Sequence, residues 1–294
     1  MKKYTRLVKS ARCNKMRAVE ALALKSGKGS GNAYEKAALI KEAIRKGLYK
    51  VATEDELEAE LALSFQNLDY PSPETAKKQA ADAFRQVYRY ISSEKRTPHG
   101  GYPVTVEPFG LLSYDVRPDY KYTGTRSFEF EVMQGKKKVK QTVTRPYIEM
   151  VKIFCRKPDV TLTGRQKDSG VMQNLEMYCL LLAARKEADR MFQSGEFPAN
   201  KPVVVCASYY YLRKNTDRSG TDPYLDTDFF VGKGAGNIVT LYEEYLPGVQ
   251  TKLDLEFKPQ FEEFVKGEDC EGDACKGCLL EEICNFKRPP KAEV

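Results

Sequence analysis

Histidine is almost absent from this chain, because His99 is the single one among 294 residues. Ser-His-Asp and Cys-His mechanisms would therefore depend on this one side chain, and a zinc hydrolase site with several histidines is excluded. His99 lies in the segment TPHGGYP, so we expect a loop residue and not a catalytic base. Polar catalysis would have to use carboxylates, lysine and tyrosine.

Long apolar runs are missing as well. No stretch of about 18 apolar residues is present to span a membrane, and the charged start MKKYTRLVKSARCNKMR lacks the apolar segment of a secretory signal. The glycine-rich segments at 25–32 and 231–237 lack the G-x4-G-K-[ST] order of a phosphate-binding loop. The sequence therefore predicts a cytoplasmic protein without a membrane span, in which thiols stay reduced.

The chain has an excess of basic residues, 48 Lys and Arg against 41 Asp and Glu, which gives a net charge of +7. This charge is compatible with nucleic-acid binding but does not establish it.

The residue pattern predicts helices first and strands later. Helices are expected over 1–24, 33–47 (ended by Gly47), 54–68, 71–91 and 171–192. Strands are expected within 104–124 and 127–134, over 145–156 as a central strand, over 201–212 as a buried strand and within 230–246. A basic hairpin or loop covers Lys136–Lys140. This order predicts an α/β core preceded by a helical region.

Half of the eight cysteines lie close together near the end of the sequence, in CEGDACKGCLLEEIC, 270–284. Cys275, Cys278 and Cys284 follow the spacing C-x2-C-x5-C and would need a fourth ligand from elsewhere. An iron–sulfur cluster, a zinc ion and disulfides are the three alternatives. The remaining thiols include three in apolar stretches, which we assign to the core as small apolar side chains: Cys155, Cys179 and Cys206.

Carboxylates occur at two expected strands. Asp119 follows Pro118 at a strand end, and Glu149 lies with Lys152 in the next apolar strand. Carboxylates at neighbouring strands can bind Mg²⁺ or Mn²⁺, which activates water and stabilises the transition state of phosphate hydrolysis. The plainer alternative, which these residues alone favour, is a turn aspartate and a surface Glu–Lys pair.

These residues together resemble the PD-(D/E)XK nuclease superfamily. The resemblance rests on the PD dipeptide at Asp119, on IEMVK at 148–152 and on QNLEMY at 173–178. The C-x2-C-x5-C spacing is similar to that of the iron–sulfur branch of this superfamily, in which a fourth cysteine lies far upstream. Cys13 occupies that place, so the resemblance extends over nearly the whole chain.

The resemblance implies a restriction-endonuclease-like mixed sheet core flanked by helices at 96–265. A helical region would precede it at 1–95 and a cysteine-rich segment would follow at 266–294. The implied activity is that of a metal-dependent DNA nuclease, an exonuclease on single-stranded or unwound ends, with a separate helicase or DNA-processing protein as a possible partner. The implied [4Fe–4S] cluster, favoured over zinc, would join the chain ends through Cys13, Cys275, Cys278 and Cys284.

The resemblance also assigns roles in the nuclease site. Asp119 and Glu149 would hold Mg²⁺ or Mn²⁺ with Glu35, which stands where the family has a histidine in GNAYE. Lys152 would assist the attacking water, and Gln173 or Tyr178 would position DNA or the lysine.

Four departures from the family pattern leave alternatives open. Glu149 and Lys152 are three residues apart and not two, so a regular strand without a bulge points them to opposite faces. Glu35 replaces the family's histidine, Asn174 and not Gln173 has the family's spacing to Tyr178, and Asp115 competes with Asp119. A catalytically inactive, cluster-bearing nucleic-acid-binding or scaffold subunit is therefore the second hypothesis. A ferredoxin-like electron carrier is the third.

Overall fold

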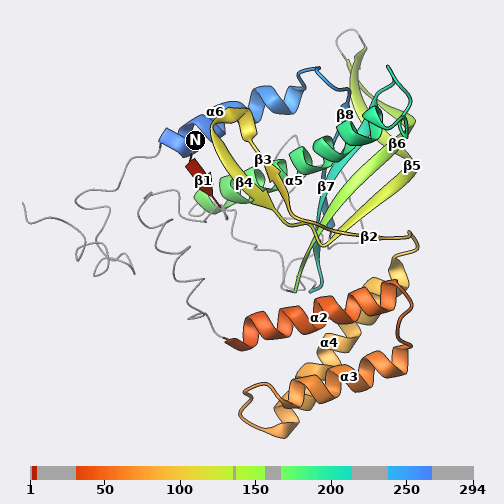
Figure 1. Cartoon of the computed structure of the whole chain (residues 1–294), viewed down its shortest axis with the longest axis vertical. Coiled ribbons are helices and arrows are strands. Elements are labelled where there is room, and N and C mark those ends of the chain that lie inside the picture. Colours follow the sequence, from red (N-terminus) through yellow and green to blue (C-terminus); the bar gives the residue numbers. More distant parts are fainter. Residues whose placement is uncertain (1, 5–30, 135–136, 156–166, 214–237, 267–294) are drawn as a thin grey trace, which may run out of the picture.

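The computed structural model describes residues 2–4, 31–134, 137–155, 167–213 and 238–266 (Figure 1). Three helices form one group, a five-stranded sheet lies next to them, and two further helices accompany the sheet on its other face. The fold is mixed α/β, as the sequence predicts. None of the helices within the described ranges is both long and apolar enough to cross a membrane.

The helical group consists of α2 (Gly31–Leu48), α3 (Glu54–Gln66) and α4 (Pro73–Ser93). Thr53 begins α3 with a capping box, and Ser72 caps α4 ahead of Pro73. These side chains satisfy backbone N–H groups that have no partner within the helix. The helices expected at 33–47, 54–68 and 71–91 are confirmed.

The helix expected over 1–24 is wrong at its start, because Lys2–Tyr4 is a short strand, β1. Residues 5–30, including Cys13, lie outside the described residues.

Gly47 does not end α2, which continues to Leu48. A Cβ atom at Gly47 would lie 2.1 Å from Cδ1 of Ile91 on α4 and 3.2 Å from Cδ1 of Leu57 on α3. Glycine therefore allows the three helices to approach closely at this point.

The five-stranded sheet has the order β2-β5-β6-β7-β8. Its strands are β2 (His99–Gly100), β5 (Tyr120–Gln134), β6 (Lys137–Phe154), β7 (Val203–Tyr211) and β8 (Ile238–Tyr245). Among the described strands of this sheet, only β6 and β7 pair in parallel. The central and buried strands expected at 145–156 and 201–212 are confirmed, and the expected basic hairpin joins β5 to β6. The exposed His99 lies in the two-residue strand β2 and not in a loop.

A smaller sheet has the order β1-β4-β3, with β3 at Val104–Val106 and β4 at Leu112–Val116. The short 3-10 helix Pro108–Gly110 joins β3 to β4. The segment 104–124, expected as strand, is thus divided between two sheets.

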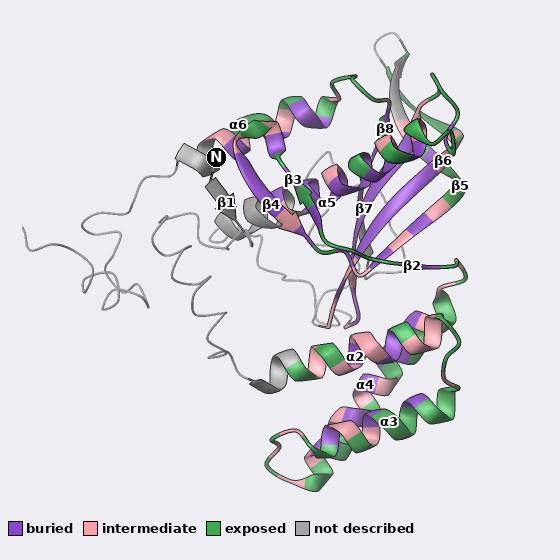
Figure 2. Ribbon diagram, in the orientation of Figure 1, coloured by how far each residue is buried: buried purple, intermediate pink, exposed green. Residues whose placement is uncertain are grey.

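Helix α5 (Lys167–Gln193) lies between the two sheets. It packs against β6 and β7 and also contacts β3, β4 and α6 (Lys252–Lys266). Its residues Leu175 to Ala184 are buried on nearly all sides (Figure 2), as expected for a helix apolar around its circumference. The expected core positions of Cys179 and Cys206 are confirmed, and Cys155 is half-buried.

The opposite face of the large sheet packs against the helical group. Ile40 and Ile44 of α2 and Tyr90 of α4 share one apolar cluster with Val151 and Ile153 of β6. The region expected as helical over 1–95 therefore shares its core with the sheet, and its charged side chains can reach the sheet's polar groups.

Candidate site at the carboxylate face of the sheet

Asp119 is held at the start of β5 by its backbone. Its N–H donates to the carbonyl of Val151 at 2.8 Å, and its carbonyl accepts from the N–H of Gly101 at 3.1 Å. A Cβ atom at Gly101 would lie 2.1 Å from the carbonyl oxygen of Pro118, so only glycine fits there. The position of Asp119 is thus fixed from both sides.

The carboxylate of Asp119 accepts from two donors. The Lys41 Nζ on α2 lies 2.8 and 2.9 Å from its oxygens, and the Ile153 N–H donates at 2.6 Å. The competing residue, Asp115, lies in the smaller sheet and accepts from the Thr105 hydroxyl at 2.7 Å. The structure therefore separates Asp115 from the face on which Asp119 lies.

Glu149 lies in the middle of β6, on the face covered by the helical group, and its side chain is 5% exposed. One carboxylate oxygen accepts from the Arg96 guanidinium and the other from the Ser208 hydroxyl. Ser208 also shares a 2.8 Å hydrogen bond with Thr240 of β8. A polar row thus crosses β6, β7 and β8 beneath the helices.

Arg96, in the segment between α4 and β2, connects this row to the helical group. Its guanidinium forms two 2.8 Å hydrogen bonds with Glu94 and lies 4.1 Å from the centre of the Tyr122 ring. Burial alone would lower the pKa of Arg96, but Glu94 and Glu149 outweigh it and raise the pKa. The guanidinium therefore remains charged and neutralises Glu149.

The strand register separates the two carboxylates. Glu149 lies opposite Tyr122, whereas Tyr120 lies opposite Val151, so Asp119 falls next to Lys152. Three residues along a strand correspond to about 10 Å, while oxygen ligands lie within about 2.6 Å of a Mg²⁺ or Ca²⁺ ion. Asp119 and Glu149 also have separate partners, so they do not form one common site here.

Lys152 points to the other face of the sheet. Residues Tyr147–Phe154 of β6 pair one by one with Val204–Tyr211 of β7, without the bulge that would bring Lys152 beside Glu149. The Lys152 Nζ lies 5.8 Å from the centre of the Phe154 ring. The expected cooperation of Lys152 with Glu149 is not observed.

Tyr178 also lies on the α5 side of the sheet. Its ring stacks between Phe109 at 5.8 Å and Phe257 at 4.5 Å, and its hydroxyl donates to Asp254. Burial raises the pKa of Tyr178. These contacts give Tyr178 a packing role. Positions 173 and 174 belong to α5, but the side chains of Gln173 and Asn174 lie outside what is described.

Glu35 is exposed on α2, six residues before Lys41. At 3.6 residues per turn, six residues place these side chains about 120° apart around the helix. Glu35 is therefore not directed toward Asp119 as Lys41 is.

The proposed cluster ligands Cys13, Cys275, Cys278 and Cys284, and the spare Cys270, lie outside the described residues. Within the described ranges, no group of three or more His, Cys, Asp or Glu side chains is arranged to hold a metal ion. Burial raises the pKa of the half-buried Cys155 thiol to about 11, which keeps it protonated at neutral pH.

A second ion-pair cluster fixes α5 to the edge of the large sheet. The Glu187 carboxylate accepts from Lys121 at 2.7 Å, from Arg190 at 3.0 Å and from the Tyr102 hydroxyl. Burial alone would raise the pKa of Glu187, but these hydrogen bonds outweigh it and lower the pKa to about 2.

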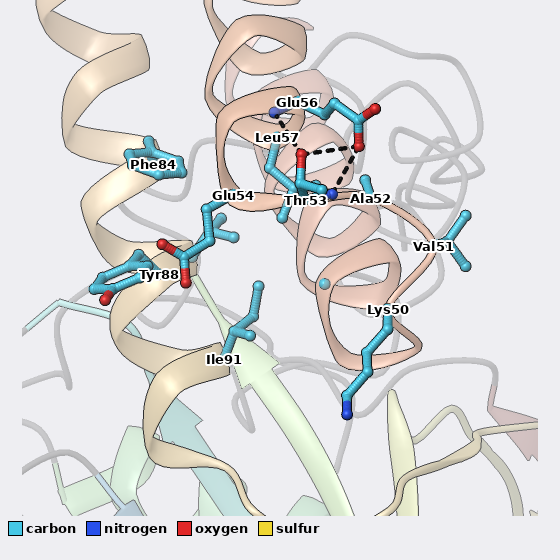
Figure 3. Close-up of a pocket in the computed structure, with 12 residues that line it drawn as sticks. Lys50, Val51, Ala52, Thr53, Glu54, Glu56, Leu57, Phe84, Tyr88 and Ile91 are labelled. Atoms are coloured by element: carbon cyan, nitrogen blue, oxygen red, sulfur yellow. Dashed lines mark hydrogen bonds between the residues drawn. The ribbon is translucent and has the colours of Figure 1, made fainter.

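A pocket of about 430 Å³ opens in the helical group, away from these carboxylates (Figure 3). Its walls are mainly apolar, and Glu54 points across it toward Tyr88 from the first turn of α3. Glu56 is occupied by the capping box with Thr53. Glu54 is thus the one carboxylate that extends over the pocket in this view. A single carboxylate over a mainly apolar pocket offers little basis for a catalytic site.

Sequence reasoning missed the three side chains that bind the candidate carboxylates, Lys41, Arg96 and Ser208, and also Thr240, which hydrogen-bonds to Ser208. Lys41 lies 78 residues from Asp119 in the sequence and Arg96 lies 53 from Glu149, so no local spacing could have identified them. Comparison with protein-family models, curated proteins and solved structures finds no match to this chain.

Proposed function

We propose that this chain binds nucleic acid on a nuclease-like scaffold and does not itself hydrolyse phosphodiester bonds. The proposed lack of hydrolysis is supported by the ion pairs that the two candidate carboxylates form. Asp119 is paired with Lys41 of α2, and Glu149 is paired with Arg96 of the segment that follows α4. Each carboxylate therefore already has a cation supplied by the chain.

The donor set fits a divalent cation poorly. Both oxygens of Glu149 and both oxygens of Asp119 accept hydrogen bonds from the protein. A shared Mg²⁺ or Mn²⁺ ion would have to displace Lys41 and Arg96 and bridge a three-residue offset along the strands. We therefore derive no hydrolytic step through a metal ion at these residues.

Nucleic-acid binding is supported by the distribution of charge. The chain carries a net charge of +7, and the distal part of the β5–β6 hairpin is rich in lysine. Basic side chains attract the phosphate backbone independently of sequence, through release of counterions. The [4Fe–4S] cluster at Cys13, Cys275, Cys278 and Cys284 is part of the proposal as a structural link between the chain ends.

A nuclease assay tests this proposal. The full-length protein is incubated with end-labelled single-stranded and duplex DNA in Mg²⁺ or Mn²⁺, and binding of the same DNA is measured by fluorescence anisotropy. We expect binding without degradation. Metal-dependent degradation that is lost in Asp119→Asn and in Glu149→Gln, but retained in the control Asp115→Asn, would refute the non-catalytic proposal.

A metal-dependent DNA exonuclease is the second candidate, because Asp119 and Glu149 lie on neighbouring strands beneath the same helices. Lys41 would then replace Lys152 as the lysine near the carboxylates. This candidate requires the helical region to move so that the metal can enter. It predicts the degradation that the first proposal denies, so the same assay separates the two.

A further inference from the structure

The hairpin formed by β5 and β6 extends well beyond the rest of the large sheet (Figure 1). Pairing of β6 with β7 begins at Tyr147, so residues 125–134 and 137–146 form a two-stranded ribbon that pairs only with itself. We call these residues the β5–β6 arm. The arm contains ten residue pairs, and a rise of about 3.3 Å from one pair to the next gives it a length of roughly 30 Å.

Aromatic contacts hold the base of the arm. The Phe128 ring packs on Tyr147 and on Tyr242 of β8, at 6.0 and 5.3 Å between ring centres, and Phe130 packs on Tyr242 at 5.5 Å. The Tyr242 hydroxyl donates to the carbonyl of Glu129 at 2.5 Å. The base of the arm is therefore anchored to Tyr147 of β6 and to Tyr242 of β8.

The arm carries a positive charge. Its residues include five Lys and Arg against two Glu, a net charge of +3. Lys137 and Lys140 are exposed, and because they are three residues apart on a strand they belong to opposite faces of the ribbon. Exposed lysines therefore lie on both faces of the arm near its tip, and Lys140 also pairs with Glu129 at 3.7 Å.

Two arginines lie directly opposite each other where the arm begins, Arg126 and Arg145. Like charges in this arrangement destabilise a strand pair. Arg145 is balanced by Glu244 at 3.1 Å, whereas the exposed Arg126 lies 5.6 Å from the centre of the Phe128 ring. The Arg126–Arg145 pair therefore does not stabilise the arm, which favours a role for these arginines other than folding.

We propose that the β5–β6 arm enters the major groove of duplex DNA and places its lysines on the flanking phosphates. This inference rests on the proposed function and names the form of nucleic acid bound. A two-stranded β-ribbon fits the B-DNA major groove, which is about 12 Å wide, whereas the major groove of an RNA duplex is too narrow and deep for side chains to read.

The aromatic residues of the arm favour duplex over single-stranded DNA. Proteins that bind single strands stack bases on accessible aromatic rings. Phe128 is buried and Phe130 is half-buried against Tyr242, and the arm contains no other aromatic residue. Lysine contacts to phosphates are therefore the main interaction that the arm can offer.

The test is a salt titration of binding with the full-length protein. Anisotropy of a labelled duplex of about 25 base pairs, a single strand and an RNA duplex is measured from about 50 to 200 mM salt, the range over which counterion release changes affinity strongly. The variant Lys137→Gln, Lys138→Gln, Lys140→Gln should bind duplex DNA at least about tenfold more weakly. Its salt slope should fall by about 2 to 3.

A second triple variant controls for total charge: Lys77→Gln, Lys78→Gln, Lys201→Gln. These lysines are exposed on α4 and before β7, so this variant loses the same charge and should keep the wild-type slope. Melting temperatures check that both variants are folded, and single substitutions replace any triple variant that is not.

Each outcome decides between the two proposals. If the wild-type protein binds no nucleic acid, both fail. If it binds duplex DNA and the arm variant binds equally well, or both triple variants weaken binding equally, the arm is not the binding element although the proposed function survives. If the wild-type protein prefers single-stranded DNA or duplex RNA, the groove-binding inference is overturned.

Discussion

Arg96 should be essential for stability, because it joins the helical group to the sheet through a buried carboxylate. Arg96→Ala removes the partner of Glu149, two hydrogen bonds to Glu94 and the contact with the Tyr122 ring. Glu149, 5% exposed, would keep Ser208 as its remaining hydrogen-bond donor. The variant leaves a buried negative charge without a cation.

The expected loss of stability follows from this burial. Breaking a fully buried ion pair by removing one partner costs about 3–5 kcal/mol. The Arg96 side chain is 35% exposed, and solvent screens that part of the interaction, so we expect about 2–3 kcal/mol. Glu149→Gln should cost less, about 1 kcal/mol, because Arg96 retains Glu94 and no unpaired charge is buried.

Urea denaturation of the single and double variants measures these values. The double variant Arg96→Ala, Glu149→Gln should be more stable than Arg96→Ala alone by about 1–2 kcal/mol, since the two residues interact directly. Arg126→Ala, which removes an exposed arginine from the same sheet, serves as the control and should cost less than about 1 kcal/mol.

One result would refute this reasoning, and a second would count against the non-catalytic proposal. A loss below about 1 kcal/mol in Arg96→Ala would show that the pair contributes no more than a surface ion pair. Stabilisation of Arg96→Ala by Mn²⁺, but not of the double variant, would show that Glu149 binds a cation once the guanidinium is removed. The second result would favour the metal-dependent nuclease.

Three further predictions concern other parts of the chain. Glu187→Gln should lower the free energy of unfolding at pH 7 by about 2 kcal/mol. In the wild-type protein, the lowered pKa of Glu187 stabilises the fold at neutral pH, and this stabilisation is lost as the pH falls from about 4.5 to about 2. Glu187→Gln should abolish this pH dependence, and pH-dependent urea denaturation measures both effects. Gly101→Ala should destabilise the fold by about 2 kcal/mol or more, because its Cβ would meet the backbone of Pro118 and displace Asp119. Thermal unfolding measures this, and an unchanged melting temperature would contradict it. Protein purified without oxygen should be brown and contain iron, whereas Cys278→Ser should lose both the colour and solubility; a colourless, zinc-containing wild-type protein would contradict the cluster.

The helices could be predicted because their signals are local. Ser72 and Pro73 mark the start of α4, and Thr53 with Glu56 marks the start of α3. The apolar strands β6 and β7 were equally recognisable by composition. Gly47 was misinterpreted as a helix end because its constraint comes from Ile91, 44 residues later, and not from its neighbours.

The candidate site could be predicted only in part, because it depends on strand register. The sequence places Asp119 and Glu149 on neighbouring strands, but it does not show which residues lie opposite each other. Register also decides the partners of each carboxylate, and Arg96 reaches Glu149 from a segment with no recognisable pattern. The faces of Glu149 and Lys152 were predictable from their spacing, whereas the absence of a bulge was not.

Register also explains why the carboxylates are neutralised separately. A residue that shares an ion with Glu149 would have to lie opposite it on β5 or β7, or two residues away in β6, at the positions of Tyr122, Cys206, Tyr147 and Val151. All four positions are occupied by buried core residues, at most 4% exposed, that pack beneath the helical group. A carboxylate or lysine at any of them would disrupt that packing. The positions around Glu149 therefore belong to the apolar core. The negative charge of Glu149 is balanced by Arg96, which approaches from the side of the helical group.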